Sequence, residues 1–190
     1  RNFIFFLAPS LFQIVVSIFV IVPITTFYLD PYDFGIIALL FAIMAPVSSI
    51  TSAPDFVLGE YYHQSDKDTQ KIIVFNMMCI DFLFRTSILI IFWLLGNKII
   101  IFFELSSYEN IYLIYYLVLL GTWLTLFWST VSKLLIVTGR GKYHFFWDTS
   151  KFLVGVFATI ISIAYFKLGT ISIIIGFVVS NLYSIIFELF

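Results

Sequence analysis

The sequence predicts an all-α fold: a polytopic membrane bundle of six transmembrane helices with a cytoplasmic N-terminus. Hydrophobic residues make up 62% of the chain and charged residues only 11%, whereas about 25% of a soluble domain is charged. A helix needs about 20 mostly apolar residues to cross the hydrocarbon layer. Stretches of that kind recur at Phe3–Tyr28, Ile36–Leu58, Ile72–Leu95, Ile111–Ile136, Phe145–Phe166 and Ile171–Phe190. They lack the in/out alternation of barrel strands, so helices remain as the way to satisfy their backbone groups in lipid.

The first stretch is predicted to be a retained helix, because it is too long for a signal-peptide core and has no small-residue cleavage site. The connector after it, Leu29–Gly35, holds Pro31 and Gly35 where one helix must end and the next restart. Two prolines lie in each of the first two helices: Pro9 and Pro23, then Pro46 and Pro54. Since a proline removes a backbone donor and tends to kink a helix, these positions are either packing irregularities or hinges of moving helices.

The later connectors are short, and they hold most of the charge. Gly59–Lys71 is predicted to be a polar inside loop, Gly96–Asn110 an outside loop, Val137–His144 a basic inside turn and Lys167–Thr170 a tight outside turn. The Gly96–Asn110 connector has an apolar centre, Ile99–Phe103, which either rests in the membrane interface or extends the third helix. These lengths leave no room for a folded extramembrane domain, so the function is expected between the helices.

The predicted orientation follows from the basic residues near the helix ends. With the N-terminus in the cytoplasm, seven Lys and Arg residues fall inside: Arg1, Lys67, Lys71, Lys133, Arg140, Lys142 and Lys151. Only Lys98 and Lys167 fall outside. Six helices then return the end of the segment to the inside. The chain starts at Arg1 and stops within an apolar run, and we expect it to be the N-terminal half of a longer transporter with two bundles.

Asp81 and Arg85 are the first candidate for a functional site. They lie four residues apart on one face of the third helix, about 14 and 20 Å into the membrane at 1.5 Å per residue. An ionisable residue at that depth costs about 3 kcal/mol on insertion scales and usually faces the bundle interior. Two interpretations stay open. The pair fixes helix packing, or it lines a water-filled path in which Arg85 meets an anionic group and Asp81 is its switchable partner.

Further ionisable residues are candidates for the same translocation path. Asp55 lies near the inside end of the second helix, and a carboxylate is too short to snorkel far. Lys133 and Lys151 lie near the inside ends of the fourth and fifth helices, with Asp148 one turn before Lys151. The lysines either snorkel to the interface or form a cationic vestibule suited to a phosphate-bearing lipid. Deeper in the fourth helix, Trp123 and Trp128 either stack on a sugar or pack between helices.

The motifs of soluble enzymes are missing from the sequence. His63 and His144 have no zinc-ligand spacing, and Gly139-Arg140-Gly141-Lys142 lacks the spacing and the Ser or Thr of a P-loop. We therefore expect no enzyme activity, no cofactor and no metal site, and a driving force from an ion gradient or the substrate gradient. A net charge of −1 without a basic face predicts no nucleic-acid partner.

Several segments resemble bacterial oligosaccharide flippases of the multidrug/oligosaccharidyl-lipid/polysaccharide superfamily. Ile21–Ile24 through Tyr28–Gly35 is similar to their first hairpin, and Pro54-Asp55 leading into Glu60-Tyr61-Tyr62 is similar to their second helix and first inside loop. The run from Ser129 to Tyr143 resembles their fourth helix and its loop, and Ile160–Leu182 resembles their fifth and sixth helices.

This resemblance implies a transporter of the bacterial cytoplasmic (inner) membrane that works by alternating access. Its substrate would be an undecaprenyl-diphosphate-linked oligosaccharide, flipped outward for O-antigen or capsule. Membrane lipids, H⁺ or Na⁺ as coupling ion, and other polysaccharide-assembly proteins are the further expected partners. Two alternatives remain: a drug/cation antiporter of the same superfamily, or a membrane-embedded polysaccharide polymerase or acyltransferase.

Overall fold

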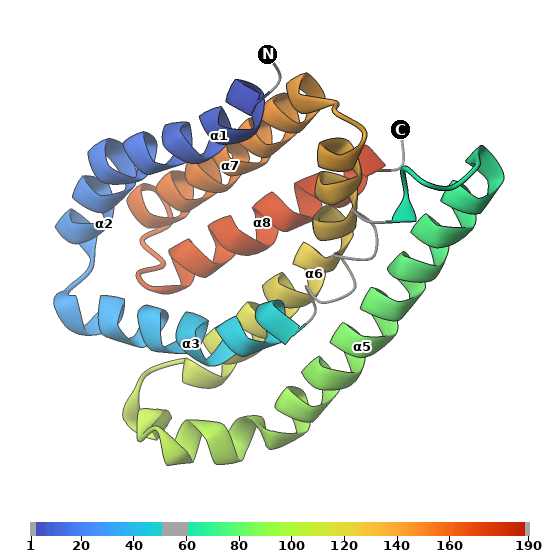
Figure 1. Cartoon of the computed structure of the whole chain (residues 1–190). Coiled ribbons are helices and arrows are strands. Elements are labelled where there is room, and N and C mark those ends of the chain that lie inside the picture. The colour runs from blue at the N-terminus through green and yellow to red at the C-terminus, as the bar shows by residue number, and fades with distance from the viewer. Residues whose placement is uncertain (1–2, 51–60, 189–190) are drawn as a thin grey trace.

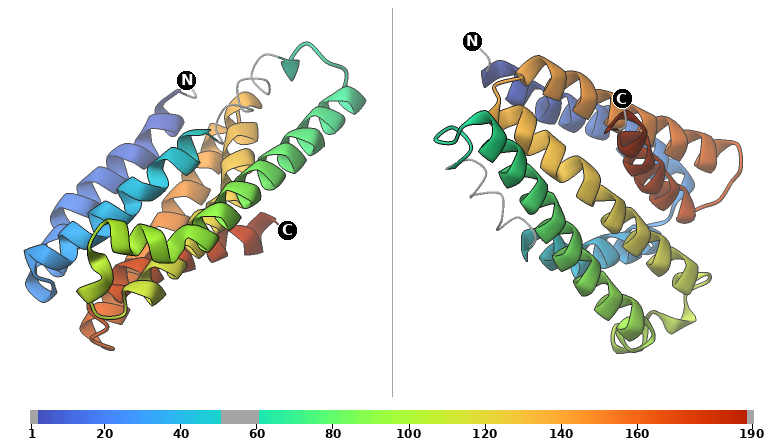
Figure 2. Two further views of the ribbon diagram at one scale, coloured as in Figure 1. Left: turned by 90° about the horizontal axis from the view of Figure 1, so that it is seen from below. Right: turned by 90° about the vertical axis from the view of Figure 1, so that its right-hand side faces the viewer.

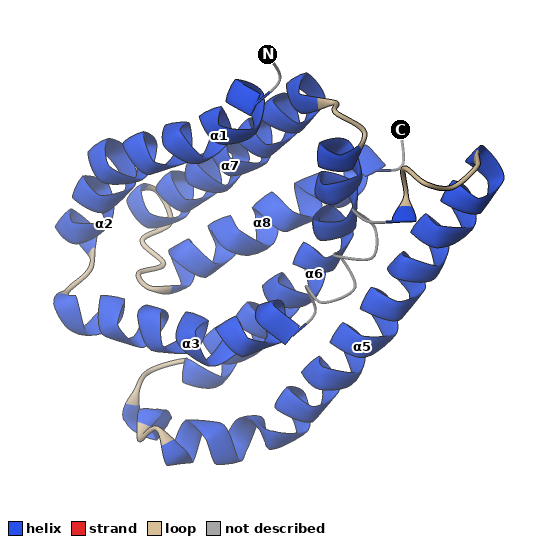
Figure 3. Cartoon of the chain, in the orientation of Figure 1, coloured by secondary structure: helices blue, strands red, loops and turns tan. Residues whose placement is uncertain are grey.

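The computed structural model describes residues 3–50 and 61–188, and every regular element in these ranges is a helix (Figure 3). In chain order the elements are α1 (Phe3–Val16), a π-helical segment η1 (Ser17–Ile21), α2 (Val22–Tyr28), α3 (Pro31–Ile50), α5 (Lys67–Phe102), a 3₁₀ turn η2 (Leu105–Ser107), α6 (Ile111–Val137), α7 (Gly141–Ala164) and α8 (Ile171–Glu188). The predicted all-α fold is confirmed for these ranges. Each of the six apolar stretches is helical where it is described, except that α7 ends at Ala164, two residues before the end of the fifth stretch.

Three of the helical segments in the described ranges are long and apolar enough to cross a membrane: Ile4–Tyr28, Lys67–Phe102 and Gly141–Ala164. Three shorter apolar segments, Pro31–Pro46, Ile111–Thr125 and Ile171–Ile186, belong to α3, α6 and α8. Length and composition therefore indicate a membrane-associated chain.

The first helical rod passes through its prolines without ending. Pro23 follows directly on Val22, whose N–H donates to the carbonyl of Ser17, five residues back, instead of to the usual fourth residue. This wider π-type turn lies where the proline removes a donor from the helix. Pro9 and Pro46 likewise lie inside α1 and α3, and Pro54 lies outside the described residues. The three described prolines thus lie within continuous helical rods.

Several helix boundaries differ from the prediction because capping residues lie inside the predicted connectors. The second helix begins at Pro31, where a proline fits the first turn, and the Asp30 side chain accepts a hydrogen bond from the N–H of Asp33 at 2.9 Å. Asp66 caps α5 by accepting from the N–H groups of Asp68 and Thr69. At its other end α5 continues to Phe102, so of the two alternatives for Ile99–Phe103 the extended helix is correct.

The turn between α6 and α7 is shorter than predicted, because a glycine ends one helix and the next begins at once. Gly139 has φ +69°, a conformation that costs glycine little. Its N–H donates to Ile136 and that of Arg140 donates to Leu135, which is the pattern of a Schellman cap. α7 then starts at Gly141, so His144, predicted in the turn, lies in the first turn of the helix.

The rods run back and forth, so that their connectors gather at two ends of the bundle (Figure 1). α8 packs against both α7 and α6, the α1–α2 rod lies along α7, and α5 lies along the outer side of α6. Two further views show the same pairing of α5 with α6 (Figure 2). At one end Tyr108, ahead of α6, hydrogen-bonds to Asp33 of α3 and to Thr170, ahead of α8. Connectors predicted on the same side of the membrane therefore meet.

Glycines let α7 and α8 approach closely. A Cβ placed on Gly176 would lie 1.9 Å from Oγ1 of Thr159 and 2.6 Å from the carbonyl oxygen of Gly155. In α8 small side chains recur every fourth residue on this face, at Ser172, Gly176, Ser180 and Ser184. Small residues at such spacing bring helices together in lipid, where dispersion contacts rather than water exclusion hold them. α7 and α8 therefore form the most closely packed pair of the bundle.

The outer helix α5 presents large apolar side chains on its exposed side. Ile72, Phe75, Leu83, Ile91 and Leu94 are each more than half exposed. The opposite face, with Met77, Leu89 and Ile100, is buried. An apolar surface that follows a helix for this length is too large for a water-soluble monomer and suits a lipid-facing helix.

Candidate functional site between α5 and α6

Asp81 and Arg85 lie in the seam between α5 and α6, with only 5% and 4% of their surfaces exposed. Their positions are about 21 and 27 Å from the Lys67 end of α5 at 1.5 Å per residue. Arg85 Nη2 lies 3.4 Å from Asp81 Oδ1, as the four-residue spacing predicts. Both groups are thus withdrawn from solvent and from the lipid-facing side of the helix.

The hydroxyl groups of α6 complete the site. Arg85 Nη1 donates to Thr125 Oγ1 at 2.9 Å, and the Thr125 hydroxyl donates to the carbonyl of Thr122 at 2.7 Å. Ser129 Oγ donates to Asp81 Oδ2 at 3.3 Å and accepts a long hydrogen bond from Arg85 Nη2 at 3.5 Å. The charged pair on one helix and the two hydroxyls on the other form a single network across the seam.

One donor of this network has no partner among the described residues. Arg85 Nε is buried and makes no hydrogen bond to any described residue. A buried donor left unsatisfied costs about 1–3 kcal/mol, more for a charged group. The guanidinium therefore retains unused capacity to bind an acceptor such as a phosphate oxygen, for which its planar fork is well suited.

Aromatic packing lies beside the network. Trp123 Nε1 donates to Thr86 Oγ1 at 3.1 Å, and its ring meets that of Phe82 edge to face. Both partners belong to α5, so Trp123 ties the two helices together, which favours the packing interpretation for this residue. The side chain of Trp128 lies outside the described part of the chain.

The other predicted path residues occupy two different places. Lys133 is half-buried on α6, four residues after Ser129, and so continues the face that carries Thr125 and Ser129 toward α5. Lys151 is half-buried on α7. Asp148, one turn before it, accepts a hydrogen bond from Gln13 Nε2 of the α1–α2 rod at 2.8 Å. Asp55 lies outside the described residues.

His144 is a residue that sequence reasoning assigned only to a turn. It is 92% buried at the start of α7, since 8% is exposed. Its Nε2 lies 3.0 Å from Ser132 Oγ of α6, and its ring meets Phe6 of α1 edge to face. The side chain thus joins three helices at the end opposite Tyr108. Neither its spacing nor its neighbours in the sequence signalled this, because the contacts come from distant parts of the chain.

At the other end, Tyr108 lies outside the helices and has a shifted pKa. Burial, together with the hydrogen bond to Asp33, raises the pKa of Tyr108 to about 12. The neutral phenol can donate to the Asp33 carboxylate, whereas a phenolate beside that carboxylate would be repelled. This connector is therefore held together by a tyrosine that stays protonated at physiological pH.

Comparison with models of protein families, with curated proteins and with solved structures finds no match to this chain. The resemblance to oligosaccharide flippases accordingly stays a prediction from the motifs.

Proposed function

We propose that the chain forms a six-span transporter bundle with a cytoplasmic N-terminus, the first half of a two-bundle flippase of the bacterial cytoplasmic membrane. Its substrate is an undecaprenyl-diphosphate-linked oligosaccharide, moved outward by alternating access for surface polysaccharide such as O-antigen or capsule. Membrane lipids surround it, H⁺ or Na⁺ is the coupling ion, and other polysaccharide-assembly proteins are its candidate partners.

The buried pair Asp81–Arg85 is the observation that carries this proposal. A buried ion pair adds little stability over apolar residues of similar size, and losing one partner is costly. Its presence in an apolar helix is better explained by a task that needs the charge. Arg85, with one donor free of described partners, is suited to a diphosphate, which is the charged group of the proposed substrate.

The way α5 is attached supports a moving part at this site. Over the described ranges, α5 packs mainly on α6 and makes only minor contacts with α3, while α7 and α8 are interlocked at their glycines. Separation of α5 from α6 would break the bonds of Arg85 to Thr125 and Ser129 and present the guanidinium to a phosphate. Neutralising Asp81, by H⁺ or by Na⁺, would remove the partner that holds Arg85 in the closed seam.

Mass spectrometry of lipid extracts after depletion of the full-length protein tests the proposal. We expect a completed undecaprenyl-diphosphate oligosaccharide to accumulate on the cytoplasmic side while its surface polymer is lost. Absence of that lipid, together with new sensitivity to cationic drugs, would instead establish the antiporter alternative. A lipid-linked unit that reaches the outer face but stays unpolymerised would establish the polymerase.

A further inference from the structure

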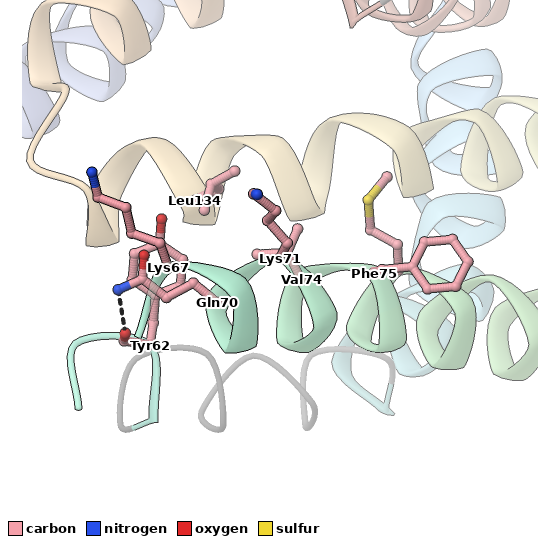
Figure 4. A pocket seen from close by; sticks show the side chains of 8 residues that line it. Tyr62, Lys67, Gln70, Lys71, Val74, Phe75 and Leu134 are labelled. Atoms are coloured by element: carbon pink, nitrogen blue, oxygen red, sulfur yellow. Dashed lines mark hydrogen bonds between the residues drawn. The ribbon is translucent and has the colours of Figure 1, made fainter. Parts of the chain in front are cut away.

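A pocket of about 490 Å³ opens between the start of α5 and the end of α6 (Figure 4). Lys67 and Lys71 extend from α5 toward α6 across its mouth, as Figure 4 shows. Its wall is apolar, formed by Val74, Phe75 and Met78 of α5 and Leu134 of α6. The site thus combines two cations at the end of the helices with an apolar surface that leads toward the middle of the bundle.

The lysines continue the helical face that carries the buried pair. Positions 67, 71, 74, 78, 81 and 85 of α5 are separated alternately by four and three residues, which places them on one side of a helix. Met78, the deepest α5 residue of the pocket, lies one turn before Asp81. The pocket is therefore the cytoplasm-proximal end of the same α5–α6 seam.

The surroundings leave the lysines available to a ligand. Lys71 Nζ pairs with Asp68 at 3.0 Å, but the two side chains are 78% and 86% exposed, and such exposed pairs are weak. Asp66 is occupied as the helix cap, where it accepts from two backbone N–H groups. Gln70 donates to the carbonyls of Tyr62 and Ser65 and so holds the preceding loop against the helix.

We propose that this pocket binds the headgroup of an anionic glycerophospholipid of the cytoplasmic leaflet, with one acyl chain lying along Phe75 and Met78. The inference rests on the membrane placement within the proposed function and not on the transported substrate. Basic pockets between transmembrane helices on the cytoplasmic side suit lipid phosphates. Phe75 and Met78 are 66% and 38% exposed, so the apolar wall is open to lipid at its side. A bound lipid would bridge the mobile seam at the end that must open.

Native mass spectrometry of the purified full-length protein, titrated with phosphatidylglycerol or phosphatidylcholine, tests the site. The double variant Lys67→Gln/Lys71→Gln should lose about 30-fold in affinity for phosphatidylglycerol, from the attraction of each lysine to an anionic lipid. The matched control Lys98→Gln/Lys167→Gln removes the same charge at the opposite end and should retain the affinity. Equal losses in both variants would show general surface charge and overturn the proposal.

Two further measurements separate the lipid from other ligands. Val74→Trp keeps both lysines but fills the pocket and should abolish retention of phosphatidylglycerol; unchanged binding by this variant would overturn the site. Inorganic phosphate at millimolar concentration should not displace the lipid, and complete displacement would identify a free anion as the ligand. Lipid binding is measured independently of transport. If the wild-type protein exports the substrate but binds no phosphatidylglycerol, this site alone is refuted. Binding in a protein that fails to export would refute only the transport proposal.

Discussion

At the scale of single residues, Asp81 and Arg85 form a buried pair, so substituting one of them affects the other. Their roles are therefore separated by comparing a single substitution with the double substitution. Arg85 is the shared partner of Asp81, Thr125 and Ser129. Removing it leaves a carboxylate in an apolar seam, whereas removing both charges leaves only hydroxyl groups, of which Thr125 keeps its bond to a backbone carbonyl. A stability effect and a functional effect of the same residue can therefore be told apart.

Arg85→Ala should lower the free energy of unfolding by about 3–5 kcal/mol, the usual effect of leaving one member of a buried pair alone. The double variant Asp81→Leu/Arg85→Met should unfold close to the wild type. If Arg85 binds the substrate, both variants lose export although the second is stable. Normal export by the double variant would reduce the pair to a packing role. Thermal unfolding in detergent and surface-polymer staining measure the two effects.

Tyr108 makes a pH-dependent contribution to stability. Its folded pKa, about 12, lies above the ordinary value of 10, so between these values the unfolded chain loses the proton first. The contribution is complete below pH 10 and is lost as the pH rises to about 12. The melting temperature of the wild type should therefore fall more steeply than that of Tyr108→Phe over this interval. Parallel curves would show that the phenol does not hold the three connectors together.

At the scale of elements, the closest helix pair should be the most sensitive to added volume. Gly176→Ala places a methyl group against Thr159 and the Gly155 backbone, and overpacking of this kind costs about 1–3 kcal/mol. Gly35→Ala is the matched control, because a Cβ there meets nothing within 4 Å; it should be neutral or stabilising, since alanine favours helices. Equal melting temperatures for the two variants would contradict the close α7–α8 contact.

The helices themselves could be predicted from hydropathy, because a run of about 20 apolar residues has few other stable structures in lipid. Their ends were predicted less well. Pro31 was assigned to a connector as a turn residue and Asp66 to a connector for its polarity, but Pro31 begins a helix and Asp66 caps one. The Asp81–Arg85 contact followed from spacing on one helix. Its partners Thr125 and Ser129 did not, because the register between two helices depends on tertiary packing that no single segment encodes.

The lysine pocket and the contact of His144 likewise depend on contacts between helices that the sequence does not predict. Lys67 and Lys71 were counted only for orientation, and the cationic vestibule was considered only for Lys133 and Lys151, as an alternative to snorkelling. The structure instead turns Lys67 and Lys71 toward α6 at the mouth of a pocket. His144 meets Ser132 and Phe6, residues of two other helices. Charge at a helix end can be predicted from sequence, but the neighbour that it faces cannot.

At the scale of the whole molecule, the number of membrane crossings decides which function is possible. Three helical segments satisfy length and hydropathy over the described residues, and three more are shorter by that criterion. The contact of Tyr108 with Asp33 and Thr170 brings together the connectors ahead of α3, α6 and α8. This arrangement supports six rods that alternate in direction, with the connectors predicted to lie outside gathered at one end.

Cysteine labelling of intact cells should distinguish the possible topologies. In a Cys79→Ala background, single cysteines replace Lys71, Lys98, Lys142 and Lys167, all of which are exposed in the structure. With six spans and a cytoplasmic N-terminus, an impermeant maleimide should label positions 98 and 167 only. If only the three long apolar segments crossed, the start of α5 would lie outside, and positions 71 and 167 would be labelled instead. With six spans and an external N-terminus, the maleimide should label positions 71 and 142. Since each topology exposes a different pair, one experiment decides whether all six helices of the bundle cross the membrane, as the proposed transport requires.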